Sequence, residues 1–154
     1  MPRELNASEL RAWRAFLDAH ASLMRRLEAE LVPYGMTLAE FDVLIQLRLS
    51  QDGRLRMTDL SERVRLSPSG ITRLVDRLAS QGLLTRGRCE SDRRGTWAIL
   101  TAAGRKRIDQ VQPTHLRSVQ QHFARPLSSS QLQALTSALE AVAGRPGSQV
   151  SSTV

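Results

Sequence analysis

The sequence predicts a mostly α-helical domain with one small β-hairpin wing. Aromatic residues make up only 4% of the 154 residues, so the core must consist mainly of aliphatic side chains, which suits packed helices. Within residues 57–100, two helix-sized apolar patterns separated by a tight turn precede an arginine-rich stretch with the features of a hairpin. This order is typical of a winged helix-turn-helix, and similar helical patterns flank it on both sides.

The first helix is expected over residues 6–32. Asn6 and Glu9 have the spacing of a capping box, and apolar residues then recur with helical periodicity. Pro33 and Gly35 end the pattern.

A second helix and a short strand should follow. Thr37 and Glu40 repeat the capping-box spacing and open the helix, which the turn at residues 51–53 ends. Residues 54–57 then have room to pair as a small strand.

The helix-turn-helix comes next. Thr58 is expected to cap its first helix, which runs to about Arg65. Ser67 caps the second, with Pro68 at the first helical position, and Gly82 ends it in a left-handed conformation.

The remaining segments give the wing and the last helices. Residues 83–88 and 96–100 are predicted as two strands of a hairpin. Thr101 and Ser128 have capping positions before two further helices, and the Gly-, Pro- and Ser-rich tail 144–154 is expected to be disordered.

These elements form one domain over residues 6–143. Its winged core spans about 37–101, and the flanking helices, 6–32 and 101–143, carry more apolar surface than this core can bury. A two-fold homodimer is the simplest way to cover the surplus, and it would place two recognition helices about one DNA turn (~34 Å) apart. An enlarged monomeric core is the alternative.

The positive charge is concentrated on the winged core. The chain has a net charge of +7, yet residues 54–107 hold thirteen Lys and Arg against five Asp and Glu. The rest of the chain is close to neutral. Such a localised excess favours a surface for the phosphates of double-stranded DNA, and a basic face kept for solubility is the alternative.

The start of the second helix of the motif is predicted to enter the major groove. Small hydroxyl residues and a glycine let the helix end approach closely, and its unpaired N–H groups face phosphate. The Arg73 guanidinium can donate two hydrogen bonds to a guanine edge. Arg77 would bind the DNA backbone or pair with a neighbouring acidic residue. The predicted contacts are Ser67, Ser69, Gly70, Thr72, Arg73 and Arg77.

The tip of the hairpin supplies a second set of candidates. Arg93 and Arg94 on a thin β-turn can enter the minor groove, where the negative potential is strong. Asp92 is expected to order the tip by accepting turn N–H groups or pairing with an arginine. A solvated surface turn is the alternative.

Several motifs together resemble the MarR-type (multiple antibiotic resistance) transcriptional regulators over about residues 6–142. They are Leu38–Leu44, Leu60–Leu78, Gly82–Arg86, Asp92-Arg-Arg94 and Leu100–Gly104. The resemblance implies a triangular helical dimer with winged lobes on pseudo-palindromic promoter DNA. A repressor is the expected role, with an activator as the alternative. The resemblance also implies release by a ligand or by oxidation. The matching contacts are Ser67, Ser69, Thr72, Arg73 and Arg77 on the helix, and Arg93 and Arg94 on the wing.

Relatives of this type often bind effectors between the dimerisation helices and the DNA-binding lobe. The residues that would line such a crevice here are Trp13, His20, Tyr34, Phe41 and Asp42, with ordinary packing as the alternative for each. The only thiol, Cys89, lies at the wing rather than near the start of the first helix, where oxidation-sensing relatives carry theirs. A small-molecule effector is therefore favoured over oxidation.

Other classes of protein find less support. No apolar run of 18 residues exists, and the N-terminus lacks a signal-peptide pattern, so a cytoplasmic protein without membrane contact is expected. One cysteine and three histidines do not form a metal-binding pattern, and no cofactor or catalytic motif is present. The chief alternative is a winged-helix protein-interaction module without sequence-specific DNA binding.

Overall fold

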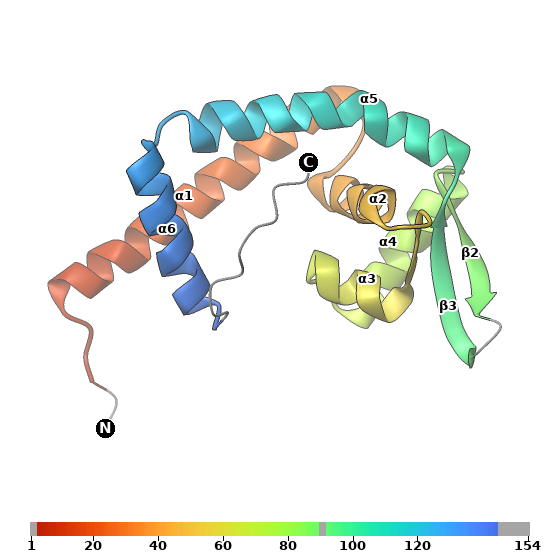
Figure 1. The fold of residues 1–154 in the computed structure, drawn as a ribbon, viewed down its shortest axis with the longest axis horizontal. Coiled ribbons are helices and arrows are strands. Elements are labelled where there is room, and N and C mark those ends of the chain that lie inside the picture. Colours follow the sequence, from red (N-terminus) through yellow and green to blue (C-terminus); the bar gives the residue numbers. More distant parts are fainter. Residues whose placement is uncertain (1–2, 90–91, 145–154) are drawn as a thin grey trace.

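The computed structural model describes residues 3–89 and 92–144, and of residues 89–95 it describes no side chains. The tail expected to be disordered therefore lies, beyond Gly144, outside the described residues. Figure 1 shows a lobe of short helices and a hairpin joined to long helices that extend away from it.

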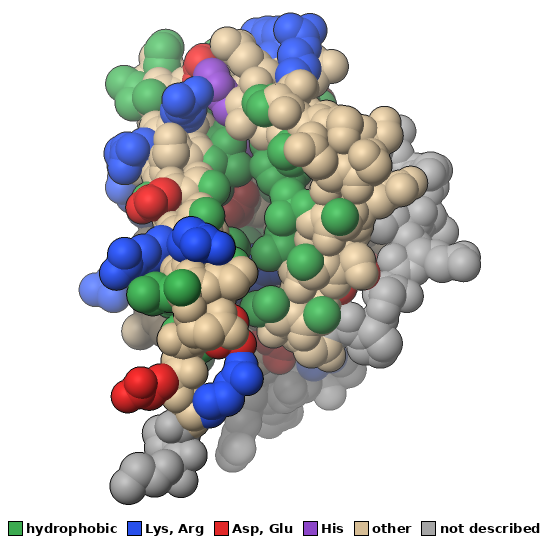
Figure 2. All heavy atoms as spheres, turned by 90° about the vertical axis from the view of Figure 1, so that its left-hand side faces the viewer, with side chains coloured by type: hydrophobic (Ala, Val, Ile, Leu, Met, Phe, Trp, Pro, Cys, Tyr) green, Lys and Arg blue, Asp and Glu red, His purple; other side chains and the backbone are tan. Residues whose placement is uncertain are grey.

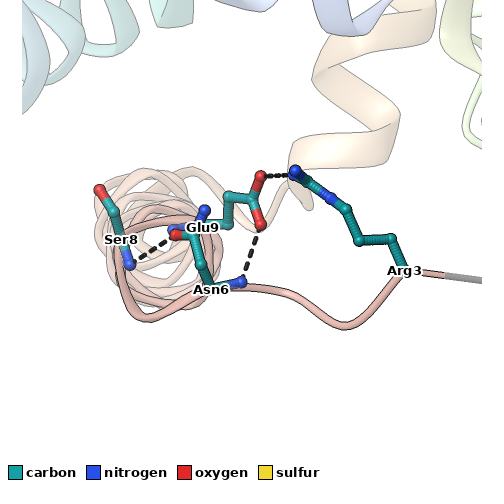
Figure 3. A network of polar contacts seen from close by, with 4 residues as sticks. All are labelled: Arg3, Asn6, Ser8 and Glu9. Atoms are coloured by element: carbon teal, nitrogen blue, oxygen red, sulfur yellow. Dashed lines mark hydrogen bonds and ion pairs between the residues drawn. The ribbon is translucent and has the colours of Figure 1, made fainter.

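The first two helices begin where the sequence predicted. Helix α1 (Ala7–Leu31) opens with a capping box in which the Asn6 side chain accepts from the Ser8 and Glu9 N–H groups. Glu9 accepts in return from the Asn6 N–H and also contacts the Arg3 guanidinium (Figure 3). After the short 3₁₀ turn η1 (Val32–Tyr34), a second capping box opens α2 (Leu38–Leu49).

The helix-turn-helix follows a short strand, β1 (Arg54–Arg56). Its first helix, α3 (Met57–Val64), starts earlier than predicted, and Thr58 as its cap is wrong. The extended backbone of Arg56, the last residue of β1, occupies the N-cap position, so the strand runs directly into the helix. Its second helix, α4 (Pro68–Ser80), is capped by Ser67 as predicted.

The hairpin completes a three-stranded antiparallel sheet. Strands β2 (Leu84–Cys89) and β3 (Asp92–Leu100) pair with each other, and β1 lies on the other side of β3. Both strands extend further toward the tip than the sequence indicated.

The C-terminal helices begin against this sheet. Helix α5 (Ala102–Val119) is capped by Thr101 and passes into a π-helical turn, η2 (Gln120–Ala124), and then α6 (Ser129–Val142). Gly104 lies so near the chain after α4 that an added Cβ would be 1.9 Å from the Leu83 carbonyl oxygen. The close start of α5 on the lobe therefore requires glycine at this position.

The hydrophobic core lies almost entirely in the lobe. Its buried side chains come from α2 and Met36 just before it, from α3, α4 and the sheet, from α5 as far as Val111, and from the end of α1. Helix α6 has no buried residue, and in α1 the buried positions come only at Leu27 and Leu31. None of the helices in the described part of the chain has the length and apolarity needed to cross a bilayer.

Candidate DNA-binding surface

Helix α4 separates its core residues cleanly from the predicted DNA contacts. Ile71, Val75 and Leu78 are buried and anchor one face of the helix in the lobe. The predicted contacts Ser67, Ser69, Thr72, Arg73 and Arg77 are all exposed, and Gly70 is half-buried. The structure thus brings the predicted recognition-helix residues together on the outward side of α4.

Hydrogen bonds at the start of α4 limit what its hydroxyl groups offer a ligand. The Ser67 hydroxyl accepts from the Gly70 N–H at 3.1 Å and lies 3.3 Å from the Ser69 hydroxyl. Thr72 donates its hydroxyl proton to the Pro68 carbonyl at 2.8 Å. In this rotamer Thr72 presents acceptor lone pairs outward, which suit an amino group on a base edge rather than a phosphate.

Arg73 is the clearest base-reading candidate. Its side chain is exposed, and within the described part of the chain it has no hydrogen-bond or ion-pair partner. An unpaired guanidinium offers five N–H donors in a planar fork, which matches the two acceptors of a guanine edge.

Arg77 is engaged differently from Arg73, although both lie on the exposed side of α4. Its Nε lies 3.0 Å from Oε1 of Glu40, a carboxylate in α2 that is almost completely buried. From the sequence, only a neighbouring acidic residue was expected as a partner for Arg77. The partner comes instead from another helix, which no local spacing could indicate.

A second ion pair ties α4 to the wing. Arg86 in β2 places its Nη2 2.8 Å from Oδ1 of Asp76 and donates to the Thr72 carbonyl at 3.3 Å. These contacts fix the side of α4 next to the sheet. They also engage Arg86, one of the basic residues counted as available to bind phosphate.

Trp97 on β3 is a feature of the basic surface that the sequence analysis missed. The guanidinium carbons of Arg54 and Arg56 lie 5.1 and 5.5 Å from the centre of its ring, within the range of cation–π contacts. Arg54 also lies 3.5 Å from the Asp52 carboxylate. Part of the positive charge therefore stabilises the sheet itself.

The wing is a hairpin as predicted, with longer strands, but the side chains at its tip lie outside the described residues. The strands pair from Leu84 opposite Leu100 to Cys89 opposite Asp92, with an irregularity between Arg88 and Cys89. The roles of Asp92, Arg93 and Arg94, and the state of the Cys89 thiol, therefore stay predictions.

The five candidate effector residues fall into two separate groups. Trp13 and His20 are exposed on α1, on either side of Phe16, whose ring centre is 6.1 and 6.2 Å from theirs. Tyr34, Phe41 and Asp42 lie in η1 and α2.

Two members of the second group, Tyr34 and Phe41, pack against α5. The Tyr34 hydroxyl bonds to Thr114 at 2.7 Å, and the buried Phe41 ring lies 4.2 Å from the ring of His115. Burial lowers the pKa of His115. Burial also raises the pKa of Asp42, partly opposed by the positive charge of Arg65.

No described pocket gathers these five side chains. One surface pocket of about 620 Å³ lies at the start of α5 between Leu100 and Gln110, and a smaller one adjoins it. Neither is lined by any of the five. No group of three or more His, Cys, Asp or Glu side chains in the described ranges is arranged to hold a metal ion.

Known proteins share this arrangement of elements. Residues 34–95 match the sequence model of the MarR family. AbsC, a MarR family transcriptional regulator from Streptomyces coelicolor, is 36% identical with a TM-score of 0.89, covering 93% of this chain and 97% of its own. Sco3205 from the same organism, solved in complex with DNA, is 33% identical with the same TM-score, over 93% and 90% of the two chains.

A curated relative agrees with these structures. The HTH-type transcriptional repressor YetL of Bacillus subtilis is 27% identical over 115 residues, which is 75% of this chain and 69% of YetL. In sequence and in fold, over most of its length, the chain belongs to the MarR family of DNA-binding transcriptional regulators.

Proposed function

We propose that this protein is a homodimeric transcriptional repressor that binds pseudo-palindromic promoter DNA and is released by a small-molecule effector. The observation that carries the DNA-binding part is the exposed side of α4, where Arg73 projects without a partner in the described chain. Arg93 and Arg94 would extend this surface into the minor groove from the wing. The DNA complex of Sco3205 supports the same use of the fold.

The homodimer is supported by apolar side chains that the single chain leaves uncovered. Trp13, Phe16 and Leu17 on α1 and Leu139 and Val142 on α6 are exposed, Val142 by 85%. Figure 2 views the molecule from this side and shows hydrophobic side chains gathered in a band along it. A self-complementary apolar face of this kind is suited to a two-fold interface.

Repression, rather than activation, is proposed because the relative YetL is named a repressor. Release by an effector is proposed because the family resemblance implies it. Because Trp13 and His20 lie apart from Tyr34, Phe41 and Asp42 in one chain, a pocket containing both groups would have to include surface from the second copy.

Binding of genomic DNA tests the function directly. Purified protein is mixed with fragmented genomic DNA, the retained fragments are sequenced, and their affinity is compared with that of random duplex at several salt concentrations. We expect a few enriched fragments with an inverted repeat and a steep fall of affinity with salt. Equal, weak retention of all fragments would favour the alternative of a protein-interaction module.

A further inference from the structure

In the ion pair between Arg77 and Glu40, the carboxylate of Glu40 is held in place by hydrogen bonds of its own. Glu40 is 1% exposed, and its two carboxylate oxygens have different partners. Oε2 accepts from the Thr37 N–H at 2.8 Å and from the Thr37 hydroxyl at 3.0 Å, which completes the cap of α2. Oε1 faces the Nε of Arg77 at 3.0 Å.

This carboxylate therefore connects the start of α2 to the last turn of α4. The start of α2 is in turn held by α1, because Oε2 of Glu28 accepts from the Leu38 N–H at 2.8 Å. Two carboxylates thus link the long helix to the recognition helix, through hydrogen bonds to the start of α2 and an ion pair to Arg77. A buried carboxylate that is hydrogen-bonded through one oxygen and ion-paired through the other has little freedom to shift, so Glu40 fixes α2 and α4 relative to one another.

We propose that Arg77 is a positioning residue that sets the orientation of the recognition helix through Glu40, and that it is not a phosphate contact. The inference rests on the proposed DNA binding and changes the role predicted for Arg77 from the sequence. Arg73, one turn earlier on α4, has no such partner among the described residues, which leaves it to read bases.

Glu40→Gln breaks the ion pair without touching the DNA-binding surface. If the amide oxygen of Gln keeps the bonds to Thr37, its NH₂ group faces the Nε–H of Arg77, and two donors oppose each other. If the amide is flipped, the cap of α2 loses its acceptor. Either orientation weakens the contacts that position α4, although residue 40 is itself buried in α2.

The experiment is a double-mutant cycle measured on DNA. Glu40→Gln, Arg77→Gln and the double variant are titrated against a retained genomic fragment and a random duplex at several salt concentrations. Arg73→Gln, which removes the same charge from the same side of α4, shows the change in salt slope caused by losing a DNA-facing charge. Affinity is expressed per folded protein, with the folded fraction taken from circular dichroism.

A positioning role predicts that each single variant loses about tenfold in affinity for the retained fragment, the worth of one well-formed base contact. Random duplex should be bound nearly as before, the salt slope should be unchanged, and the double variant should bind no worse than either single one. If Arg77→Gln does not fold, the same cycle with Arg77→Lys must show the same lack of additivity.

Two results would overturn the proposal. A salt slope that falls by about one in Arg77→Gln, with normal affinity in Glu40→Gln, would make Arg77 a phosphate contact. Reduced stability with unchanged affinity per folded protein would make the pair purely structural. Failure of the unmodified protein to bind any DNA would instead refute the proposed function itself.

Discussion

The lobe and the two outer helices, α1 and α6, bury their apolar residues to very different extents. In the lobe, side chains such as Leu44, Ile71 and Leu78 are fully enclosed by the chain's own elements. In the first turns of α1 and in α6, apolar residues of similar size stay exposed, and α6 contributes nothing to the core. The lobe thus has its own core, whereas the apolar residues of the outer helices stay uncovered in the single chain and would be buried only in the proposed dimer.

The two regions should therefore respond differently to the same kind of substitution. Changes in the lobe are expected to act on folding and on DNA recognition. Changes in the outer helices are expected to act on association between chains, which makes their effect depend on protein concentration.

The largest effect should come from opening a cavity in the lobe. Leu44→Ala removes a side chain with no exposed surface, and we expect the free energy of unfolding to fall by about 2–5 kcal/mol. Chemical denaturation followed by circular dichroism measures this change. A loss below about 1 kcal/mol would show that the lobe core is not as tightly packed as described.

A charge in the outer helices should separate the chains while leaving the lobe folded. Phe16→Glu places a carboxylate in the exposed apolar face of α1, and we expect the dimer dissociation constant to rise roughly a hundredfold because the charge cannot be buried. Gln81→Glu, the same new residue on the exposed surface of the lobe, is the control. Equal dimerisation of both variants would remove α1 from the interface.

Within the lobe, Arg73 should affect recognition rather than folding. Arg73→Ala is expected to cost about 1–3 kcal/mol in binding to a retained genomic fragment, with a smaller loss on random duplex. Competitive titration of the two DNAs provides the comparison. An equal loss on both would assign Arg73 to the DNA backbone.

The smallest effect concerns pH. Burial lowers the pKa of His115 in the folded protein, so the unfolded chain binds the proton more readily. The free energy of unfolding should therefore decrease as pH falls below the unfolded value of about 6.5 toward the lower folded value. His115→Gln should flatten this part of the pH profile, and an unchanged profile would show that other groups cause it.

The sequence predicted the features that depend on neighbouring residues. The caps at Asn6, Thr37, Ser67, Thr101 and Ser128 all form, because a capping side chain needs only the N–H groups of the next turn. The cap at Thr58 failed because β1 had already set the backbone that leads into α3.

The sequence could not predict features that depend on packing between distant elements. Glu40 was read correctly as half of a capping box, yet its second oxygen serves Arg77 on another helix. The contacts of Trp97 with two arginines likewise require the pairing of β1 with β3. Charge counting consequently overstated how many basic side chains are left for DNA.

In the proposed complex, two copies of this chain, joined through their outer helices, present two lobes to one DNA site. Sedimentation velocity of the protein alone and with a retained duplex measures how many chains each species contains. We predict a free species of two chains and a complex of two chains on one duplex. A single chain in solution that also binds the duplex singly would contradict the account.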